Sequence, residues 1–400
     1  MKALKKYFDR IRPNFEPGGK YHAFRSVYDG FETFLFTPDT TSATENAVQI
    51  HDARDSKRTM IIVVLALMPC MLFGMYNIGY QNAIAAGASS IPFFPTFLYG
   101  LLALLPTIVV TYVVGLGIEF MVAQWRGEEI QEGFLVTGIL IPLICPVETP
   151  LWMIAVATAF AVIFAKEVFG GTGFNIVNIA LIARAVLFFS YPAQMSGDRV
   201  FIARDQIFGL GYNLPDTFTG ATPLGQVATS AGGSDILAVS GDALSLWDMF
   251  LGLIPGSVGE TSTLCILIGA AILLFTGIAN WRVMFSVIAG GVVMGLIANA
   301  TCTETYPASF LSVGAQLCLG GFMFAAVFMA TDPVTAARTT AGKYIYGFLI
   351  GVIAVIIRTY NNGYPEGAML AVLLMNVFAP LIDWCVVQVN INRRLKRIKA

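Results

Sequence analysis

The stretch FLYGLLALLPTIVVTYVVGLGI, residues 97–118, contains no charged side chain. A helix needs roughly 20 mainly apolar residues to cross the hydrocarbon layer of a membrane, so this stretch predicts a membrane-spanning helix. The composition of the whole chain supports the same interpretation. Hydrophobic residues make up 56% of the 400 positions and charged residues 12%, whereas soluble domains carry roughly 25% charged residues. We therefore expect an all-α, polytopic membrane protein.

Nine further apolar stretches occur along the chain, which gives about ten expected transmembrane helices. The third is short and is interrupted by Pro142 and Pro146. The ten lie near residues 59–76, 97–118, 133–146, 151–168, 175–192, 262–279, 283–300, 311–330, 344–358 and 367–388. They predict a cytoplasmic N-terminal segment, a first five-helix membrane repeat, an extracytoplasmic loop, a second five-helix membrane repeat and a basic cytoplasmic tail, at residues 1–58, 59–192, 193–261, 262–388 and 389–400.

The distribution of lysine and arginine predicts the orientation in the membrane. With the N-terminus in the cytoplasm, the inner segments hold most of these residues, including the run RRLKRIK at 393–399. The outer segments then hold Arg199, Arg204 and Arg358. Cytoplasmic segments carry such an excess of positive charge, so both termini are expected inside and the loop at 193–261 outside. A loop of this length in a compact protein is usually functional.

The two halves share an interrupted apolar pattern. Gly-Phe at 133–134 opens a stretch that ends in Cys-Pro-Val at 145–147, and Gly-Phe at 321–322 opens one that ends in Asp-Pro-Val at 332–334. Because each half holds five spans, an odd number, the second copy must be inverted relative to the first. Interrupted segments at corresponding positions of inverted repeats indicate a transport site.

Carboxylates near or within apolar spans are candidates for a cation pathway. Ionisable groups in a membrane are expensive to insert and are therefore functional by default, and carboxylate oxygens suit small hard cations. Glu132, Asp332 and Asp383 are the predicted pathway residues. Glu119 and Glu167 lie near span ends, where a solvated helix end explains them without any function.

Several absences narrow the possible functions. The chain has neither a G-x-x-x-x-G-K-[ST] loop nor a strand–G-x-G-x-x-G–helix unit, so neither standard nucleotide-binding motif is present. It also has no C-x-x-C pair, and so no zinc or iron–sulfur framework of its own. A net charge of −1 gives no overall attraction to nucleic acid. The glycine-rich run at 170–173 is interpreted as a turn that allows close helix packing.

Two short motifs lie in or beside the long loop. Thr-Gly-Ala-Thr-Pro at 219–223 is by composition a turn. Ser257 and Glu260 have the spacing of a helix capping box, which predicts a helix start at that point.

Together these segments resemble the flavin-carrying membrane subunit, designated B, of the sodium-translocating NADH:quinone reductases, and the similarity covers nearly the whole chain. Any one matching motif would be weak evidence, whereas the set is specific. The matching segments are residues 18–21, 55–58, 166–173, 219–222, 255–262, 330–335, 364–367 and 380–383.

The resemblance implies a flavoprotein of the bacterial inner membrane. In that family the last Thr of a Ser-Gly-Ala-Thr motif carries FMN through a phosphoester, and here that position is Thr222, with Thr219 in place of the usual Ser. The family also binds riboflavin noncovalently and reduces ubiquinone while it translocates sodium. Asn175 and Asn178 are the candidates for the second flavin or the quinone. The implied partners are the other subunits, one of which oxidises NADH, an extracytoplasmic flavin transferase and membrane lipid.

Two alternatives remain open at this point. The first is the corresponding membrane subunit, designated D, of the related ferredoxin:NAD oxidoreductase, which shares the flavin motif but is expected to lack most of the polar segment before Thr59. The second is a solute channel without redox function, because the family's fold resembles urea and ammonium transporters. Bound flavin distinguishes that channel from both redox proteins.

Overall fold

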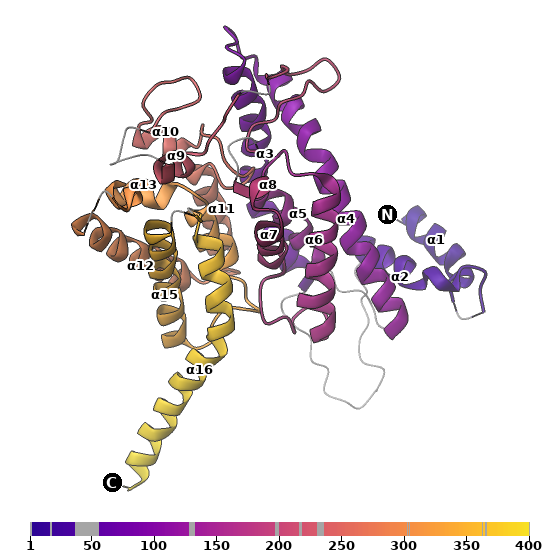
Figure 1. Ribbon diagram of the computed structural model, residues 1–400. Coiled ribbons are helices and arrows are strands. Elements are labelled where there is room, and N and C mark those ends of the chain that lie inside the picture. The colour runs from indigo at the N-terminus through magenta and orange to yellow at the C-terminus, as the bar shows by residue number, and fades with distance from the viewer. Residues whose placement is uncertain are drawn as a thin grey trace.

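The computed structural model describes residues 2–16, 18–36, 56–127, 133–196, 200–215, 218–229, 236–301, 303, 305–361, 363–364 and 366–399. Over these residues the chain is a bundle of helices, and its extended pairing is limited to two isolated bridges. Figure 1 shows the first half of the bundle beside the second, with the helices of each half grouped together. The expected all-α class is confirmed.

Six helices in the described part of the chain are long and apolar enough to cross a membrane. Five are regular α-helices, and the sixth changes to a π-helix at Ala161–Lys166 and then to a short 3-10 turn at Glu167–Phe169. The six are α3 (Ser56–Ala85), α4 (Phe93–Arg126), α6 (Leu151–Phe160) with its extension, α12 (Trp281–Ala300), α15 (Thr340–Tyr360) and α16 (Ala368–Lys399). A multi-pass membrane protein follows from these lengths.

The other four predicted spans are shorter or broken. Three of them are single helices, α5 (Phe134–Ile144), α7 (Ile179–Ser190) and α11 (Thr263–Phe275). The eighth span is divided into α13 (Val313–Cys318), α14 (Phe322–Phe324) and a π-helix at Ala325–Met329. Helix α5 ends one residue before Cys145 because Pro146 disfavours helical backbone there. Gly320 and Gly321 break the eighth span with φ angles of 60° and 68°, which glycine adopts readily.

The two halves pack in the same order. In the first half α4 contacts both α5 and α6, and α6 contacts α7; in the second half α12 contacts α13 and α15, and α15 contacts α16. The halves meet where α3 packs against α11 and where α7 packs against α16. This correspondence supports the predicted repeat, whose inverted relation stays a prediction.

Small residues let the second half pack closely. A Cβ added at Gly351 of α15 would overlap with the carbonyl oxygen of Val287 in α12, and one added at Gly290 would overlap with that of Phe348. Membrane helices use such positions to bring their backbones together.

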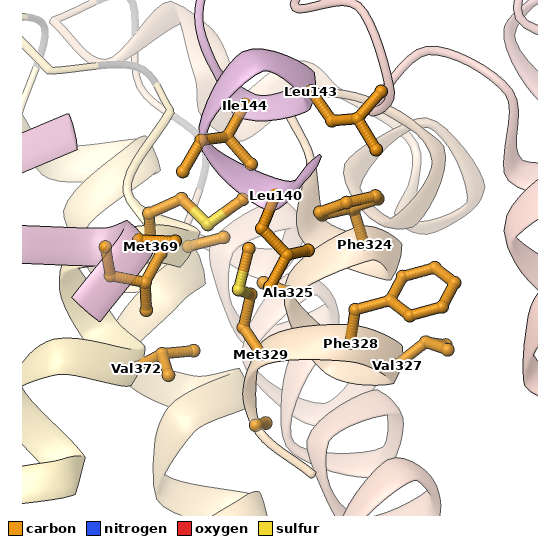
Figure 2. Packing of buried hydrophobic residues seen from close by; sticks show 14 of the residues in the cluster. Leu140, Leu143, Ile144, Phe324, Ala325, Val327, Phe328, Met329, Met369 and Val372 are labelled. Carbon is orange, nitrogen blue, oxygen red and sulfur yellow. The ribbon is translucent and has the colours of Figure 1, made fainter. Parts of the chain in front are cut away.

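The core lies where the short helices of both halves meet (Figure 2). Leu140 and Ile144 of α5 face Phe324 and Phe328 of the broken eighth span, and Met369 of α16 packs beside them. All five side chains are buried. An apolar barrier therefore crosses the middle of the molecule.

The polar segments lie at the two ends of the bundle. The loop after α7 contains three short helices, α8 (Pro192–Ser196), α9 (Pro223–Thr229) and α10 (Leu246–Leu251). At the opposite end α1 (Lys2–Ile11) and α2 (Arg25–Leu35) lie beside the end of α4, and α16 projects beyond the other helices (Figure 1). Ser26 fixes this arrangement by donating its hydroxyl to Gln124 Oε1 at 2.9 Å.

Candidate functional site

Two cavities lie at opposite ends of the apolar barrier. The inner cavity opens near the side of α1 and α2, has about 830 Å³ of empty space including its mouth, and is lined by Thr59, Met60, Val63, Gly133, Val136, Thr137, Leu140, Lys166, Thr172, Asn175, Asn178, Ile179, Leu273, Ile278, Ala279, Phe328, Thr331, Asp332, Pro333 and Val334. The outer cavity has about 350 Å³ of empty space including its mouth, and is lined by Thr222, Pro223, Leu224, Ile254, Pro255, Gly256, Ser257, Glu260, Thr261, Cys318, Leu319, Gly320, Gly321 and Glu366. Residues 322–327 run between the cavities and bury all their side chains.

The inner cavity brings together three of the predicted site residues. Asn178 caps α7, where its Oδ1 accepts the backbone N–H of Ala180 at 3.0 Å. Its Nδ2 donates to Oδ2 of Asp332 at 3.3 Å, so the amide connects the two halves. Asn175 lines the same cavity and donates to the carbonyl oxygen of Val177 at 3.0 Å.

Asp332 is held by its own turn. Its Oδ1 accepts the backbone N–H of Val334 at 3.0 Å, and its Oδ2 accepts the hydroxyl of Thr335 at 3.2 Å. These donors and the Asn178 amide satisfy both carboxylate oxygens at the end of the broken eighth span. The carboxylate can attract a cation or accept a hydrogen bond from a polar ligand in the cavity.

A buried ion pair, which the sequence analysis did not identify, borders the inner cavity. Lys166 is 2% exposed, lines the cavity and forms an ion pair with Glu119 of α4, which is 4% exposed. The interpretation of Glu119 as a solvated helix end is therefore wrong. Glu167 is the one that lies nearer the surface, where it pairs with Arg126 at 3.4 Å. Glu119 and Lys166 both lie near span ends, so only the fold shows that their side chains meet.

The remaining predicted cation residues lie apart from this cavity. Asp383 of α16 accepts the backbone N–H of Arg338 at 2.7 Å and that of Thr339 at 3.0 Å, which satisfies donors at the start of α15. It is not among the residues that line either described cavity. Glu132 lies outside the described residues.

Thr222 lies at the outer cavity. Its hydroxyl accepts the backbone N–H of Gly225 at 3.1 Å and so caps α9, which begins at Pro223. Thr222 is half-buried on the cavity wall, whereas Thr219 is exposed. Of the two threonines in the motif, Thr222 is therefore the one that lines the outer cavity.

Beneath Thr222 lies a buried charged cluster that joins both halves. Arg184 of α7 donates to Glu260 at 2.6 Å, and it also pairs with Glu366 and with the carbonyl oxygen of Ile144 at the end of α5. The predicted capping box at Ser257 and Glu260 is therefore wrong. The helix begins at Thr263 instead, and Ser262 caps it by accepting the Cys265 N–H at 3.3 Å.

A second buried arginine holds the broken eighth span. Arg358 of α15 donates to the carbonyl oxygen of Leu319 at 3.0 Å and to that of Gly320 at 3.3 Å, and it also reaches the carbonyl oxygen of Gln316. These are the orphan acceptors that a helix end leaves inside a membrane. The arginine therefore makes the break between α13 and α14 possible.

Buried hydroxyls without a protein partner lie at both cavities. Among the described residues, Thr261 Oγ1 at the outer cavity and Thr172 Oγ1 at the inner cavity are buried and have no hydrogen-bond partner. Buried polar groups are normally satisfied, so both hydroxyls are suited to a polar ligand.

A family model described as NQR2, RnfD, RnfE matches residues 43–392, which include both cavities. The chain belongs to the NQR2, RnfD, RnfE family.

Curated relatives match this family member over nearly its whole length. A Na(+)-translocating NADH-quinone reductase component from Chromohalobacter salexigens, the subunit designated B, is 44% identical, with 99% of this chain and 97% of the relative covered. Proteins of the same description from Ectopseudomonas mendocina and Klebsiella pneumoniae are 42% and 41% identical, with 98% of this chain and 99% of each relative covered. Together with the membrane helices, these bacterial relatives identify a multi-pass protein of the bacterial inner membrane.

Proposed function

We propose that this chain is the membrane subunit of a sodium-translocating NADH:quinone reductase in which electrons pass from covalent FMN through riboflavin to ubiquinone. The observation that supports this most directly is the placement of Thr222 at the outer cavity, on the opposite side of the apolar barrier from Asn178 and Asp332. Two sites on opposite sides of the membrane are what electron transfer across it requires. The description that the relatives share supports the same assignment.

The outer cavity offers groups suited to the phosphate of an FMN linked to Thr222. A phosphoester needs a hydroxyl oxygen, and the Thr222 hydroxyl lies at the cavity wall. The unpartnered hydroxyl of Thr261 and the backbone of Gly256, Gly320 and Gly321 line the same space. Glycines permit a close approach of a ligand to the backbone. When bound, FMN would supply one-electron transfer chemistry at this surface.

The inner cavity suits the second ring-shaped ligand. It combines apolar walls with a few placed polar groups, the usual composition of a cofactor site. Asn175 and Asn178 would orient riboflavin or quinone through their amides, and Leu140 and Phe328 provide apolar surface. The residues of this chain therefore hold and orient the ligand, and the apolar barrier keeps water away from its inner face.

Sodium would pass along carboxylates on the same side of the apolar barrier as the inner cavity. Asp332 lies in the inner cavity, Asp383 of α16 contacts the turn before α15, and Glu132 is the third predicted residue. Carboxylate oxygens are suitable ligands for a hard cation. Coupling requires two states with different sodium affinity that the redox state biases, and Asp332 is placed for this because it shares a cavity with the proposed electron acceptor.

The assignment also predicts partners. NADH would be oxidised on another subunit, since this chain has neither standard nucleotide-binding motif. A flavin transferase acting outside the cytoplasm would attach FMN to the loop at 193–261. The full-length match, which includes α1 and α2, favours the sodium-translocating reductase over the ferredoxin:NAD oxidoreductase alternative.

A denaturing gel viewed under ultraviolet light tests this function. The purified wild-type chain should fluoresce, because a phosphoester survives denaturation, and a Thr222→Ala variant that still inserts should not. A Thr219→Ala variant is the matched control and should keep its fluorescence. A dark wild-type band would contradict the redox assignment and favour a solute channel.

A further inference from the structure

The pair formed by Lys166 and Glu119 has no explanation in stability alone. Both groups are almost fully buried, and transferring two charges out of water often outweighs their mutual attraction. Replacing such an ion pair by well-packed apolar residues commonly leaves a protein equally stable or more stable. Charged residues within membrane segments accordingly point to function.

Irregular helical backbone places Lys166 at the wall of the inner cavity. Lys166 ends the π-helix at Ala161–Lys166, and the chain then makes a short turn before Gly170, Gly171 and Gly173, all at positive φ. Single π-turns inside helices occur frequently at functional sites. The extra residue in the turn changes the direction in which the last side chains project.

The Lys166 ammonium has donors to spare. It carries three N–H groups, and within the described part of the chain it is hydrogen-bonded to one acceptor, Glu119. On a side chain that is 2% exposed and lines a cavity, the remaining donors need a polar partner. The unpartnered hydroxyl of Thr172 lies on the same cavity wall.

The charges that line the inner cavity are complementary. Among the described residues that line it, Lys166 from the first half and Asp332 from the second carry the charges. A ligand that fits both would offer an acceptor oxygen to the ammonium and a donor N–H to the carboxylate or its amide neighbour Asn178. An isoalloxazine ring has carbonyl oxygens and an imide N–H on one edge, whereas an oxidised quinone has carbonyl oxygens only.

We propose that Lys166, oriented by Glu119, binds the carbonyl oxygen of a redox-active ring in the inner cavity, with the Thr172 hydroxyl as a second donor. The inference rests on the proposed function, because it places the electron acceptor in this cavity. A positive charge at this position would stabilise the negative charge that reduction adds to the ring. We take the ring to be an isoalloxazine because its imide N–H can donate to Asp332. A quinone is the other ligand that offers such a carbonyl oxygen.

The double variant Glu119→Gln/Lys166→Met tests the proposal because it removes both buried charges together. In the purified complex we expect normal in-gel flavin at Thr222 but only about a tenth of the wild-type riboflavin after acid extraction, since a charge-assisted hydrogen bond contributes that factor or more. Normal riboflavin with a roughly tenfold higher KM for ubiquinone-1 would identify the ring as the quinone. Lys343→Met is the matched control and should change neither value.

Wild-type riboflavin content together with a wild-type KM in the double variant would overturn the proposal. Should the double variant fail to assemble, Thr172→Val decides the matter, because it keeps the ion pair and nearly the same shape. We expect it to lower riboflavin content or raise the KM severalfold, and wild-type values there would overturn the proposal. Fluorescence at Thr222 is measured in the same samples, so a failure here is distinguishable from a failure of the proposed function.

Discussion

Asn178 donates its side-chain amide to Asp332 across 154 residues of sequence, and this hydrogen bond of 3.3 Å joins the two halves of the protein at the inner cavity. Asn178 begins a helix in the first half, and Asp332 ends the broken span in the second. A movement of one half against the other would therefore change the surroundings of the carboxylate.

Replacing the Asp332 carboxylate should weaken the response to sodium. Asp332→Asn keeps the size of the side chain but removes its charge, so we expect the sodium concentration for half-maximal quinone reduction to rise roughly tenfold, with the in-gel fluorescence of FMN at Thr222 unchanged. Glu167→Gln, which removes the carboxylate that pairs with Arg126 near the same end, should behave as wild type. Unchanged sodium dependence in Asp332→Asn would remove this residue from the pathway.

Asp383 allows a charge effect to be separated from a capping effect. It accepts the backbone N–H groups of Arg338 and Thr339 and the Thr339 hydroxyl at 2.5 Å. If Asp383 serves the cation, Asp383→Asn raises the sodium requirement, and Thr339→Ala, which weakens the cap by about 1 kcal/mol, does not. Equal shifts in thermal stability with normal sodium dependence in both variants would instead assign Asp383 to the helix cap.

Arg184 should be essential for stability. Arg184→Met leaves Glu260 and Glu366 buried without their cationic partner, and breaking such a buried group destabilises by about 3–5 kcal/mol. We expect poor assembly or a clearly lowered Tm in detergent, measured by size-exclusion chromatography after heating. Arg126→Met, which breaks a more exposed pair, should change little. A wild-type Tm for Arg184→Met would refute the structural role of the cluster.

The orientation can be tested with a single introduced cysteine. Ser240 is exposed in the long loop, and Asn392 is exposed near the end of α16. In a background without reactive native thiols, an impermeant reagent should label Ser240→Cys in intact cells and Asn392→Cys only after lysis. The reverse pattern would invert the topology predicted from Lys and Arg.

Local sequence predicted the features that depend on local chemistry. Prolines and glycines marked the interrupted helices, since these residues break helical backbone. Asp332 was predicted as a carboxylate at the end of an apolar run, and Asn178 as a candidate ligand residue near the glycine-rich turn. Both lie in the inner cavity.

Pairings between distant residues were the part that sequence could not predict. Glu260 has a local explanation in its spacing from Ser257, yet its partner is Arg184, which lies 76 positions away. Glu119 and Lys166 stand 47 positions apart near two different span ends. Whether such a charge meets water or a counter-ion depends on how the helices pack, and local periodicity does not specify that.

Peptide mass spectrometry on the purified chain tests the central claim most directly. The claim is that the Thr222 hydroxyl, half-buried at the outer cavity, carries FMN through a phosphoester. We predict that the proteolytic fragment containing Thr222 has the added mass of FMN less one water, with fragment ions that place it on Thr222. An unmodified fragment in a flavin-loaded preparation, or an adduct on Thr219, would contradict the account.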